Sequence, residues 1–234
     1  MKRILILLLL VFPVALSSAQ SDKRLRGIDK ELESLLDDYK ASGFAVAVVD
    51  NDNIIYSRGF GLRDRENNLP VTPNTLFAIG SCSKAFTSAI LGQLQQETDL
   101  SLDDKPAKYI NDFRFHNDEM NNQITIKDLM THRTGLPRHD YSWYFFPTQD
   151  RDSLIRRVEF QEPAFGVREQ WYYNNFMFLA QGVIAENITG KSWEQNIKDR
   201  FFQPLGMNRS NVDIEGLAAD DDHAVGYETV NNQE

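Results

Sequence analysis

Ser81 and Lys84 are residues whose types and spacing could support nucleophilic chemistry. They lie three positions apart, where the apolar spacing of residues 81–97 predicts the start of a helix. On a helix this spacing places both side chains on one face, with Cβ atoms about 5–6 Å apart. A serine hydroxyl is a poor nucleophile until a neighbouring group accepts its proton, and a lysine amine can be that base. Taken alone, however, the spacing favours an N-cap serine followed by a solvated lysine.

Tyr173 and Asn175 form a second candidate pair, within the segment 171–175. A tyrosine beside a lysine can carry protons when the positive charge lowers the pKa of its phenol. An asparagine two residues later can hold either the lysine or a substrate. The Tyr-x-Asn pattern also begins at Tyr109 and at Tyr172, so the pattern by itself selects no register. An aromatic core cluster capped by asparagines at a helix start would give the same letters.

Several other reactive residue types receive structural explanations. His132 lies in a Thr-His-Arg-Thr-Gly turn, where a hydrogen bond that fixes the turn is the expected role. His139 and Asp140 could belong to a Ser-His-Asp triad, but the sequence has no Gly-x-Ser-x-Gly elbow. The segment 220–223, Asp-Asp-Asp-His, has metal-ligand residue types, and a charged loop is its more common explanation. Cys82 is expected to point into the core.

The composition bounds the class of protein. The chain has 234 residues, of which 41% are hydrophobic and 25% charged, and these proportions exclude disordered, collagen-like and coiled-coil proteins. Its single cysteine excludes a disulfide framework and a zinc site built from cysteines. The formal net charge of −9 argues against binding nucleic acid through a broad basic face. The length suits one full-sized domain.

The first residues are typical of a secretory signal peptide, assigned to residues 1–19. Lys2 and Arg3 precede an apolar run over residues 4–16, and small residues lead up to Ala19. The run contains Pro13 and is shorter than the ~20 residues that a membrane-spanning helix needs. We therefore expect a mature domain of residues 20–234 that is periplasmic or extracellular and keeps no stable membrane span after cleavage.

Hydrophobic periodicity and turn residues define the elements that must position the candidate groups. Helices are expected over residues 28–39, 81–97, 152–158 and 174–187, and a β-hairpin is expected from strands 44–49 and 54–56, followed by a polar loop over residues 63–73. Capping boxes at Thr125 and Ser192 open two more helices, which are expected to end near Gly135 and Pro204. The mature chain therefore reads as one continuous domain.

The predicted sheet is short of strands. A strand that is apolar at every position, such as 44–49, is usually covered on both faces and flanked by other strands. Its one strong partner is the segment 54–56, and an isolated two-stranded hairpin is marginal in water. We therefore expect the sheet to need strands that would follow residue 234. The alternative is that short strands within the chain escape detection by pattern.

The order of these segments resembles the serine β-lactamase and penicillin-binding-protein superfamily, and most of all its class C-like branch, which includes DD-peptidases and serine esterases. The similarity covers roughly residues 75–207, which is more than half of the chain. It is carried by five segments: 77–87, 124–140, 173–175, 189–193 and 204–207.

The resemblance implies a fold and a site. The fold is α/β and β-lactamase/transpeptidase-like, with an antiparallel sheet flanked by helices, a helical subdomain, and C-terminal strands that this chain lacks. Ser81 matches the acylated nucleophile of the Ser-x-x-Lys motif, and Lys84 its base or proton-relay partner. Tyr173 and Asn175 match the Tyr-x-Asn motif, with Tyr173 catalytic and Asn175 binding substrate. The third motif, Lys or His followed by a small residue and Gly, is not found before Glu234.

The resemblance also implies a function: a secreted or periplasmic serine hydrolase that forms an acyl-enzyme on Ser81 and hydrolyses an amide, β-lactam or ester bond. No metal or organic cofactor is expected, and the partners are a small-molecule or peptide substrate rather than nucleic acid. Oligomeric state is not implied. Two alternatives are a penicillin-binding sensor-type module, which is acylated without turnover, and a catalytically inert fragment.

Overall fold

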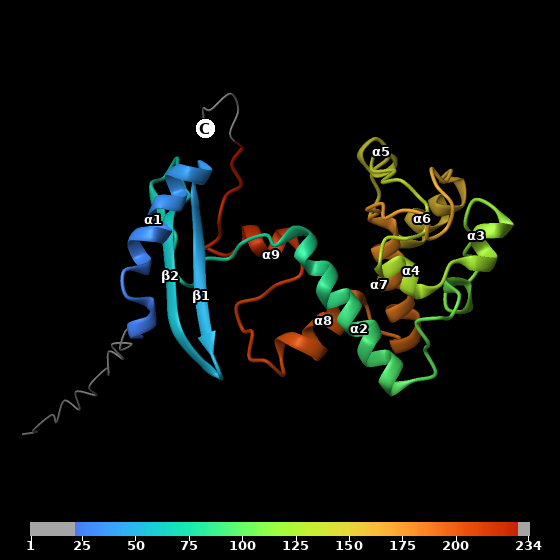
Figure 1. Cartoon of the computed structure of the whole chain (residues 1–234), viewed down its shortest axis with the longest axis horizontal. Helices are drawn as coiled ribbons and strands as arrows, with labels where there is room; N and C mark the ends of the chain where they lie inside the picture. The colour runs from blue at the N-terminus through green and yellow to red at the C-terminus, as the bar shows by residue number, and fades with distance from the viewer. Residues whose placement is uncertain (1–21, 229–234) are drawn as a thin grey trace, which may run out of the picture. The chain divides into compact units, whose positions relative to one another are not determined.

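A computed structural model describes residues 22–228 of the chain, and its contacts divide these residues into two compact units (Figure 1). In the described range, the first unit comprises residues 22–77 and 218–228, and the second comprises residues 78–217. The expected signal peptide, residues 1–19, lies outside the described residues. Within residues 22–228, no helix has the length and apolar character that a bilayer crossing requires.

The first unit is built on an antiparallel hairpin, as the sequence predicts. Its elements are a 3₁₀ turn at Lys23–Leu25, helix α1 (Ile28–Tyr39) and strands β1 (Gly43–Asp50), β2 (Asn53–Asp64) and β3 (Leu69–Pro70). The three strands form a sheet in the order β1-β2-β3, with Phe44 opposite Phe60. Helix α1 packs along β2, and Figure 1 shows it lying beside the hairpin.

Strand β2 is longer than predicted and extends into the segment that the sequence assigns to a polar loop. Gly59 and Gly61 interrupt the alternation of side chains, so the second half of β2 carries no strand pattern. The glycines are required by packing, because a Cβ on Gly59 would lie 2.3 Å from the carbonyl oxygen of Val71. The chain after β2 returns close to the strand and forms β3 there.

Strand β1 does not have the two-sided cover that its apolar sequence favours. In the described residues it is the first strand of the sheet, and its side chains alternate between half-buried and exposed. Val49 is 62% exposed and Ile54, from β2, is 66% exposed. The expected antiparallel sheet is therefore present, and its three described strands leave β1 with one paired neighbour, β2.

Residues 218–228 return to the first unit and are held there through Asp222. The amide of Leu76 donates to the carbonyl oxygen of Asp222 at 2.8 Å. The Asp222 carboxylate accepts hydrogen bonds from the hydroxyls of Thr72 and Thr75, both at 2.6 Å, and pairs with Arg63 at 3.1 Å. The acidic segment 220–223 thus contains a carboxylate that ties two distant parts of the chain together.

The second unit is helical. Its α-helices are α2 (Ser83–Glu97), α3 (Asp118–Gln123), α4 (Ile126–Met130), α5 (Tyr141–Tyr144), α6 (Arg151–Arg156), α7 (Phe176–Thr189) and α8 (Trp193–Ile197). Between and beside them lie 3₁₀ turns at Gly80–Cys82, Pro106–Lys108 and Arg157–Phe160, and a π-helical turn at Lys198–Phe202. Helix α9 (Ile214–Ala218) follows at the boundary of this unit.

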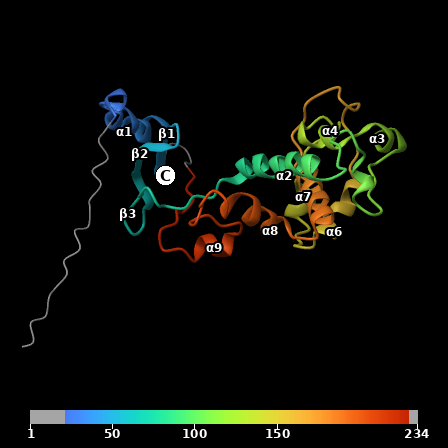
Figure 2. The ribbon, with the colours of Figure 1, turned by 90° about the horizontal axis from the view of Figure 1, so that it is seen from below.

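Helix α7 is the centre of the second unit. It packs against α2, α4, α6 and α8, which surround it in Figure 2. Phe176 and Ile184 of α7 are fully buried, as are Ile90 and Leu91 of α2. Burying an aliphatic or aromatic side chain of this size stabilises a fold by about 1.5–3 kcal/mol. The two helices that carry or adjoin the candidate site residues are therefore fixed to each other by a dry core.

Several expected boundaries shift in the structure. The helix expected over 81–97 starts as a 3₁₀ turn at Gly80–Cys82 and becomes α-helical at Ser83. The helix opened by the Thr125 capping box ends at Met130 rather than near Gly135. The helix expected over 174–187 runs from Phe176 to Thr189 and ends at Gly190, whose φ is 67°.

The expectation that Cys82 lies in the core is wrong, because the thiol is exposed. Helix α2 buries a stripe formed by Thr87, Ile90, Leu91 and Leu94. Cys82 is five positions before Thr87, which places it about 140° around the helix from that stripe, since each residue turns about 100°.

Candidate active site

Ser81, Lys84 and Tyr173 meet in the second unit. The Ser81 Oγ lies 2.6 Å from the phenol oxygen of Tyr173, and either atom can be the donor. The Lys84 Nζ donates a hydrogen bond to the same Ser81 Oγ at 3.0 Å. The structure therefore places an alcohol, a phenol and an ammonium group in direct contact, although Tyr173 is 92 positions from Ser81.

The start of α2 sets the positions of Ser81 and Lys84. Gly80 has a φ of 49°, a left-handed conformation that glycine adopts readily, and the chain then enters the 3₁₀ turn that contains Ser81. Lys84 follows in the first turn of α2, and its spacing of three residues from Ser81 places both side chains on the same side of the helix start. Ser81 remains exposed at this end of the helix, while Lys84 is half-buried.

The segment before α7 sets the position of Tyr173. The amide of Tyr172 donates to the carbonyl oxygen of His132 at 2.9 Å, and the amide of Asn174 donates to His132 Nδ1 at 3.2 Å. The fully buried Asn174 side chain donates from Nδ2 to the carbonyl oxygen of Pro137 at 2.6 Å. Three hydrogen bonds thus fix the backbone on both sides of Tyr173 to the turn at residues 132–137.

His132 has the structural role that the sequence predicts, a hydrogen bond that fixes its turn. Because Nδ1 accepts from the amide of Asn174, the ring proton is on Nε2. Burial, and then the positive charge of Lys84, lower the pKa of His132, so the imidazole is neutral at pH 7. The ring centroid lies 4.5 Å from that of Tyr173, and His132 therefore supports the tyrosine by packing.

Two positive charges act on the ring of Tyr173. The Lys84 Nζ lies 4.7 Å from the ring centroid, and the Arg138 Cζ lies 4.9 Å from it. Burial raises the pKa of the Tyr173 phenol, but hydrogen bonding with Lys84 and Ser81 and the charges of Lys84 and Arg138 outweigh this effect. The net result is a phenol whose pKa lies below its ordinary value, as a proton-carrying tyrosine requires.

Asn175, the fourth predicted site residue, makes a different contact. Its Nδ2 donates to Asp140 Oδ1 at 3.3 Å, and Asp140 Oδ2 accepts from Arg138 Nε at 2.6 Å. Among the described residues, Asn175 is thus joined to Arg138 through a shared carboxylate rather than hydrogen-bonded to Ser81. No sequence pattern singles out Arg138, and the sequence offers Asp140 only as a possible triad member together with His139. His139 Nε2 instead lies 3.2 Å from the carbonyl oxygen of Glu162.

A hollow opens beside the reactive groups. It has a volume of about 410 Å³ and is lined by Arg138, Trp171, Tyr172 and Tyr173. Trp171 is 63% exposed, which is unusual for so large an apolar side chain. Aromatic walls and one guanidinium group are suited to holding an organic molecule, and Tyr173, which contacts Ser81, is part of the lining.

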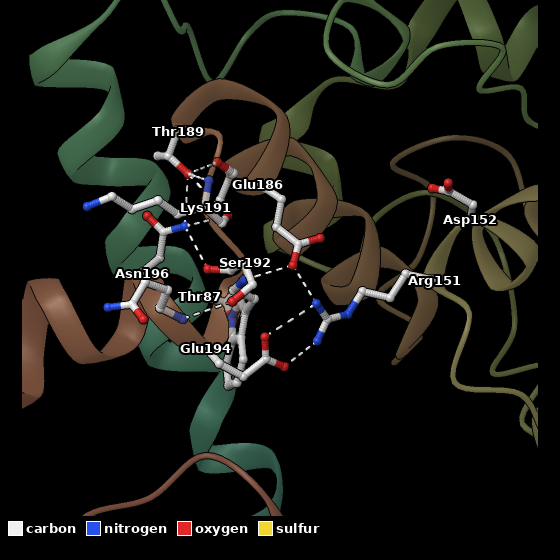
Figure 3. Close-up of polar contacts among 12 residues, drawn as sticks. Thr87, Arg151, Asp152, Glu186, Thr189, Lys191, Ser192, Glu194 and Asn196 are labelled. Atoms are coloured by element: carbon white, nitrogen blue, oxygen red, sulfur yellow. Dashed lines mark hydrogen bonds and ion pairs between the residues drawn. The ribbon is translucent and has the colours of Figure 1, made fainter.

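A polar cluster holds α2 in place one turn beyond Lys84. The indole Nε1 of Trp193, from α8, donates to Thr87 Oγ1 at 3.0 Å, and the Trp193 amide donates to Glu186 Oε1 at 2.7 Å. Arg151 of α6 forms ion pairs with Glu186 of α7 and with Glu194 of α8 (Figure 3). Four helices, α2, α6, α7 and α8, are therefore linked by one continuous set of contacts.

A second buried contact supports the turn that carries His132. Asp128 is 4% exposed, and its carboxylate accepts from Arg168 Nε at 2.8 Å and from the Thr125 amide at 2.9 Å. The second of these bonds confirms the predicted capping box at Thr125. The Arg168 amide donates to the carbonyl oxygen of Arg133 at 2.8 Å. These bonds tie the start of α4, the turn after it and the approach to Tyr173 into one frame.

Comparisons with known proteins agree on one family. A family model described as Beta-lactamase matches residues 28–234. The chain is 32% identical to the unguisins hydrolase of Aspergillus campestris (strain IBT 28561), over 80% of this chain and 36% of that protein. It is 30% identical to the teichoic acid D-alanine hydrolase of Staphylococcus aureus (strain MRSA252), over 81% of this chain and 44% of that protein.

Solved structures give the same result. The octameric penicillin-binding protein homologue from Pyrococcus abyssi has a TM-score of 0.78 and 28% identity, over 90% of this chain and 49% of that one. A class C beta-lactamase has a TM-score of 0.73 and 26% identity, over 90% of this chain and 56% of that one. The chain therefore has a β-lactamase/transpeptidase-like fold, and it spans about half of the length of these structures and less than half of the two curated relatives.

Proposed function

Since the chain belongs to the beta-lactamase family, we propose that it is part of a serine hydrolase that forms an acyl-enzyme on Ser81. The observation that carries this proposal is the contact geometry of Ser81, whose Oγ lies 2.6 Å from the Tyr173 phenol oxygen and 3.0 Å from Lys84 Nζ. A hydroxyl held at these distances from a potential base and a cation has the arrangement that nucleophilic catalysis needs.

The first chemical step is attack of Ser81 Oγ on a carbonyl carbon. Tyr173, as the phenolate, accepts the hydroxyl proton, and Lys84 stabilises the negative charge that moves between the two oxygens. The backbone N–H of Ser81 is the proposed donor to the resulting oxyanion. The bond from carbonyl carbon to the leaving nitrogen or oxygen then breaks, and the Tyr173 phenol gives its proton to that atom.

The second step releases the acyl group. A water molecule gives a proton to the Tyr173 phenolate while the water oxygen attacks the carbonyl carbon of the Ser81 ester. The bond between Ser81 Oγ and that carbon then breaks, and Oγ regains a proton from the Tyr173 phenol. The side chains return to their starting protonation states, so one relay serves both steps. No organic cofactor or metal enters either step as we propose it.

The substrate proposed is a small molecule or peptide with an amide, lactam or ester bond. Two relatives are named as hydrolases, one of teichoic acid D-alanine and one of unguisins, and a structural neighbour is a class C beta-lactamase. The open hollow of about 410 Å³ with aromatic walls has room for such a group. We further propose that residues 1–19 are a signal peptide, so that residues 20–234 act in the periplasm or outside the cell.

The test is covalent labelling. A fluorophosphonate or a labelled penicillin is expected to mark the intact chain once, and Ser81→Ala is expected to abolish the mark. Ser83→Ala is the matched control, since Ser83 lies two positions later at the start of α2 and is expected to leave labelling unchanged. Equal labelling of wild type and Ser81→Ala would refute the assignment of the nucleophile. One equivalent of bound penicillin without subsequent hydrolysis would instead indicate a sensor-type module.

A further inference from the structure

Arg138 makes a contact that the two-residue relay of lysine and tyrosine does not require. Its guanidinium carbon lies 4.9 Å from the centroid of the Tyr173 ring, close to the 4.7 Å that separates the same centroid from Lys84 Nζ. Cations over the face of an aromatic ring attract its π electrons, and they also stabilise a negative charge on the ring oxygen. Tyr173 therefore has two cationic neighbours, from elements far apart in the sequence.

Arg138 is held in this position by a carboxylate that also contacts the Tyr-x-Asn segment. Asp140 Oδ2 accepts from Arg138 Nε at 2.6 Å, and Asp140 Oδ1 accepts from Asn175 Nδ2 at 3.3 Å. The Asp140 side chain is 15% exposed, so the anchor is more enclosed than the arginine, which is 52% exposed. His139, between them, has a left-handed φ of 52°, and this conformation lets residues 138 and 140 turn back toward each other.

The charged and titratable groups that face Tyr173 come from several elements. Lys84 belongs to the first turn of α2, and Arg138 and Asp140 belong to the loop before α5. His132, from the turn after α4, is neutral at pH 7 because burial lowers its pKa. Asp140 faces Arg138 and Asn175 rather than the ring, so the charges in contact with the ring itself are both positive.

We propose that Arg138 is a positioning residue of the Ser81 site: anchored by Asp140, it holds a second positive charge against Tyr173 and favours the phenol oxygen as the acceptor of the Ser81 proton. The role of Tyr173 as that acceptor rests on the proposed function, whereas the coupling between Arg138 and Tyr173 does not. The direction of the effect agrees with the lowered pKa of Tyr173, to which the Arg138 charge contributes after Lys84 and Ser81.

The coupling is measured without any catalytic turnover. The full chain is labelled with ¹³Cζ-tyrosine, and the Tyr173 resonance is assigned by its loss in Tyr173→Phe. Arg138→Gln is expected to shift the titration of this resonance to higher pH, while Arg138→Lys, which keeps a positive charge, is expected to restore most of the wild-type titration. An unchanged midpoint in Arg138→Gln would overturn the proposal.

The same variants are tested by the rate of fluorophosphonate labelling at pH 7. Arg138→Gln is expected to slow labelling on the order of threefold, a modest factor because solvent screens a half-exposed cation. Arg156→Gln is the matched control, since Arg156 is an exposed arginine of α6 in the same unit, and both the titration and the rate are expected to stay at wild-type values. A slower rate with an unmoved titration midpoint would contradict the proposed route through Tyr173.

The two proposals fail in different ways. If wild type is not labelled at Ser81 while the Tyr173 resonance still responds to Arg138→Gln, the proposed function is wrong and the coupling stands. If wild type is labelled and Arg138→Gln titrates like wild type, the hydrolase proposal stands and the role of Arg138 is wrong.

Discussion

The Tyr173 phenol oxygen is 2.6 Å from the Ser81 hydroxyl oxygen, within the range of short, charge-assisted hydrogen bonds between oxygens. The two residues precede different helices: Ser81 lies in the 3₁₀ turn before α2, and Tyr173 lies in the segment before α7. The contact depends on the turn at residues 132–137, because the backbone on both sides of Tyr173 is hydrogen-bonded to that turn. The site's function should therefore respond both to its own polar groups and to that turn.

Removal of the Tyr173 hydroxyl tests the relay directly. Tyr173→Phe is expected to slow labelling of Ser81 by roughly 10²–10⁴-fold, the usual contribution of one positioned proton-transfer group. The ring keeps its packing against His132, so the thermal unfolding midpoint should change little. Second-order rate constants with a fluorophosphonate provide the measurement.

Tyr141→Phe is the matched control for this change. Tyr141 belongs to α5 in the same unit, is 73% exposed and stacks on Phe145 at a centroid distance of 5.6 Å. Its variant should be labelled at nearly the wild-type rate. If the two variants were labelled at equal rates, Tyr173 would have no special part in proton transfer.

The pH dependence of labelling follows from the lowered pKa of Tyr173. Burial acts to raise this pKa, and the contacts with Lys84 and Ser81 and the charge of Arg138 lower it overall. The phenolate is the form that accepts a proton, so the labelling rate should rise as pH increases toward the Tyr173 pKa and level off above it. A pH–rate profile measures this rise, which should be absent from Tyr173→Phe; a profile of identical shape in both proteins would contradict the assignment.

The sequence predicts those parts of the fold and site that depend on local spacing. Apolar residues at helical intervals predict helix α1, and the turn-forming residues 50–53 between two apolar runs predict the hairpin. The pairing of Ser81 with Lys84 follows from a spacing of three residues at a helix start. The choice of Tyr173 over Tyr172 and Tyr109 came from the family resemblance, because the three-letter pattern occurs in all three places.

The sequence does not predict features that depend on unusual backbone conformations or on interrupted patterns. Asn175 and Asp140 are 35 positions apart, and their hydrogen bond requires the left-handed residue His139 in a loop with no periodic pattern. The second half of β2 carries no strand pattern because its two glycines remove the alternation that marks a strand. Cys82 lies outside the core because its spacing from Thr87 places it about 140° around the helix from the buried stripe of α2, so an apolar residue type alone does not indicate burial here.

A substitution at Gly135 tests the turn at residues 132–137, to which the backbone around Tyr173 is hydrogen-bonded. The φ of Gly135 is 86°, and a Cβ there would lie 2.3 Å from the carbonyl oxygen of Phe165. Gly135→Ala is therefore expected to lower the free energy of unfolding by more than ~1 kcal/mol, the cost of the left-handed conformation alone. Labelling of Ser81 should also slow, since Phe165 and the turn would have to separate.

Gly92→Ala is the matched control for that substitution. Gly92 lies inside α2, and a Cβ there would meet nothing within 4 Å. Alanine at an open position of a helix interior should raise the free energy of unfolding by about 0.5–1 kcal/mol. Denaturant titrations of the two variants should move in opposite directions, and a shift in the same direction would contradict the structural reading of Gly135.

Asp128 links stability to pH. Burial acts to raise the pKa of its carboxyl, but hydrogen bonds from Arg168 and Thr125 outweigh burial and lower the pKa below 3.8. A carboxyl whose pKa is lower in the folded state contributes stability above its unfolded pKa and loses it as pH falls through the folded value. The contribution is therefore complete at pH 7 and declines below about pH 4.

Asp128→Ala should consequently lower the free energy of unfolding at pH 7 by about 2 kcal/mol, because it removes a helix cap and a largely buried ion-pair partner. Asp103→Ala provides the comparison, since Asp103 is 76% exposed, pairs with Lys127 at 3.2 Å and should contribute less than ~1 kcal/mol. Urea titrations at pH 7 and pH 3 measure both differences. The loss caused by Asp128→Ala should shrink at pH 3, because the carboxyl of the unfolded wild-type chain binds a proton below its ordinary pKa. A loss that is equal at both pH values would show that the charge of Asp128 does not stabilise the fold.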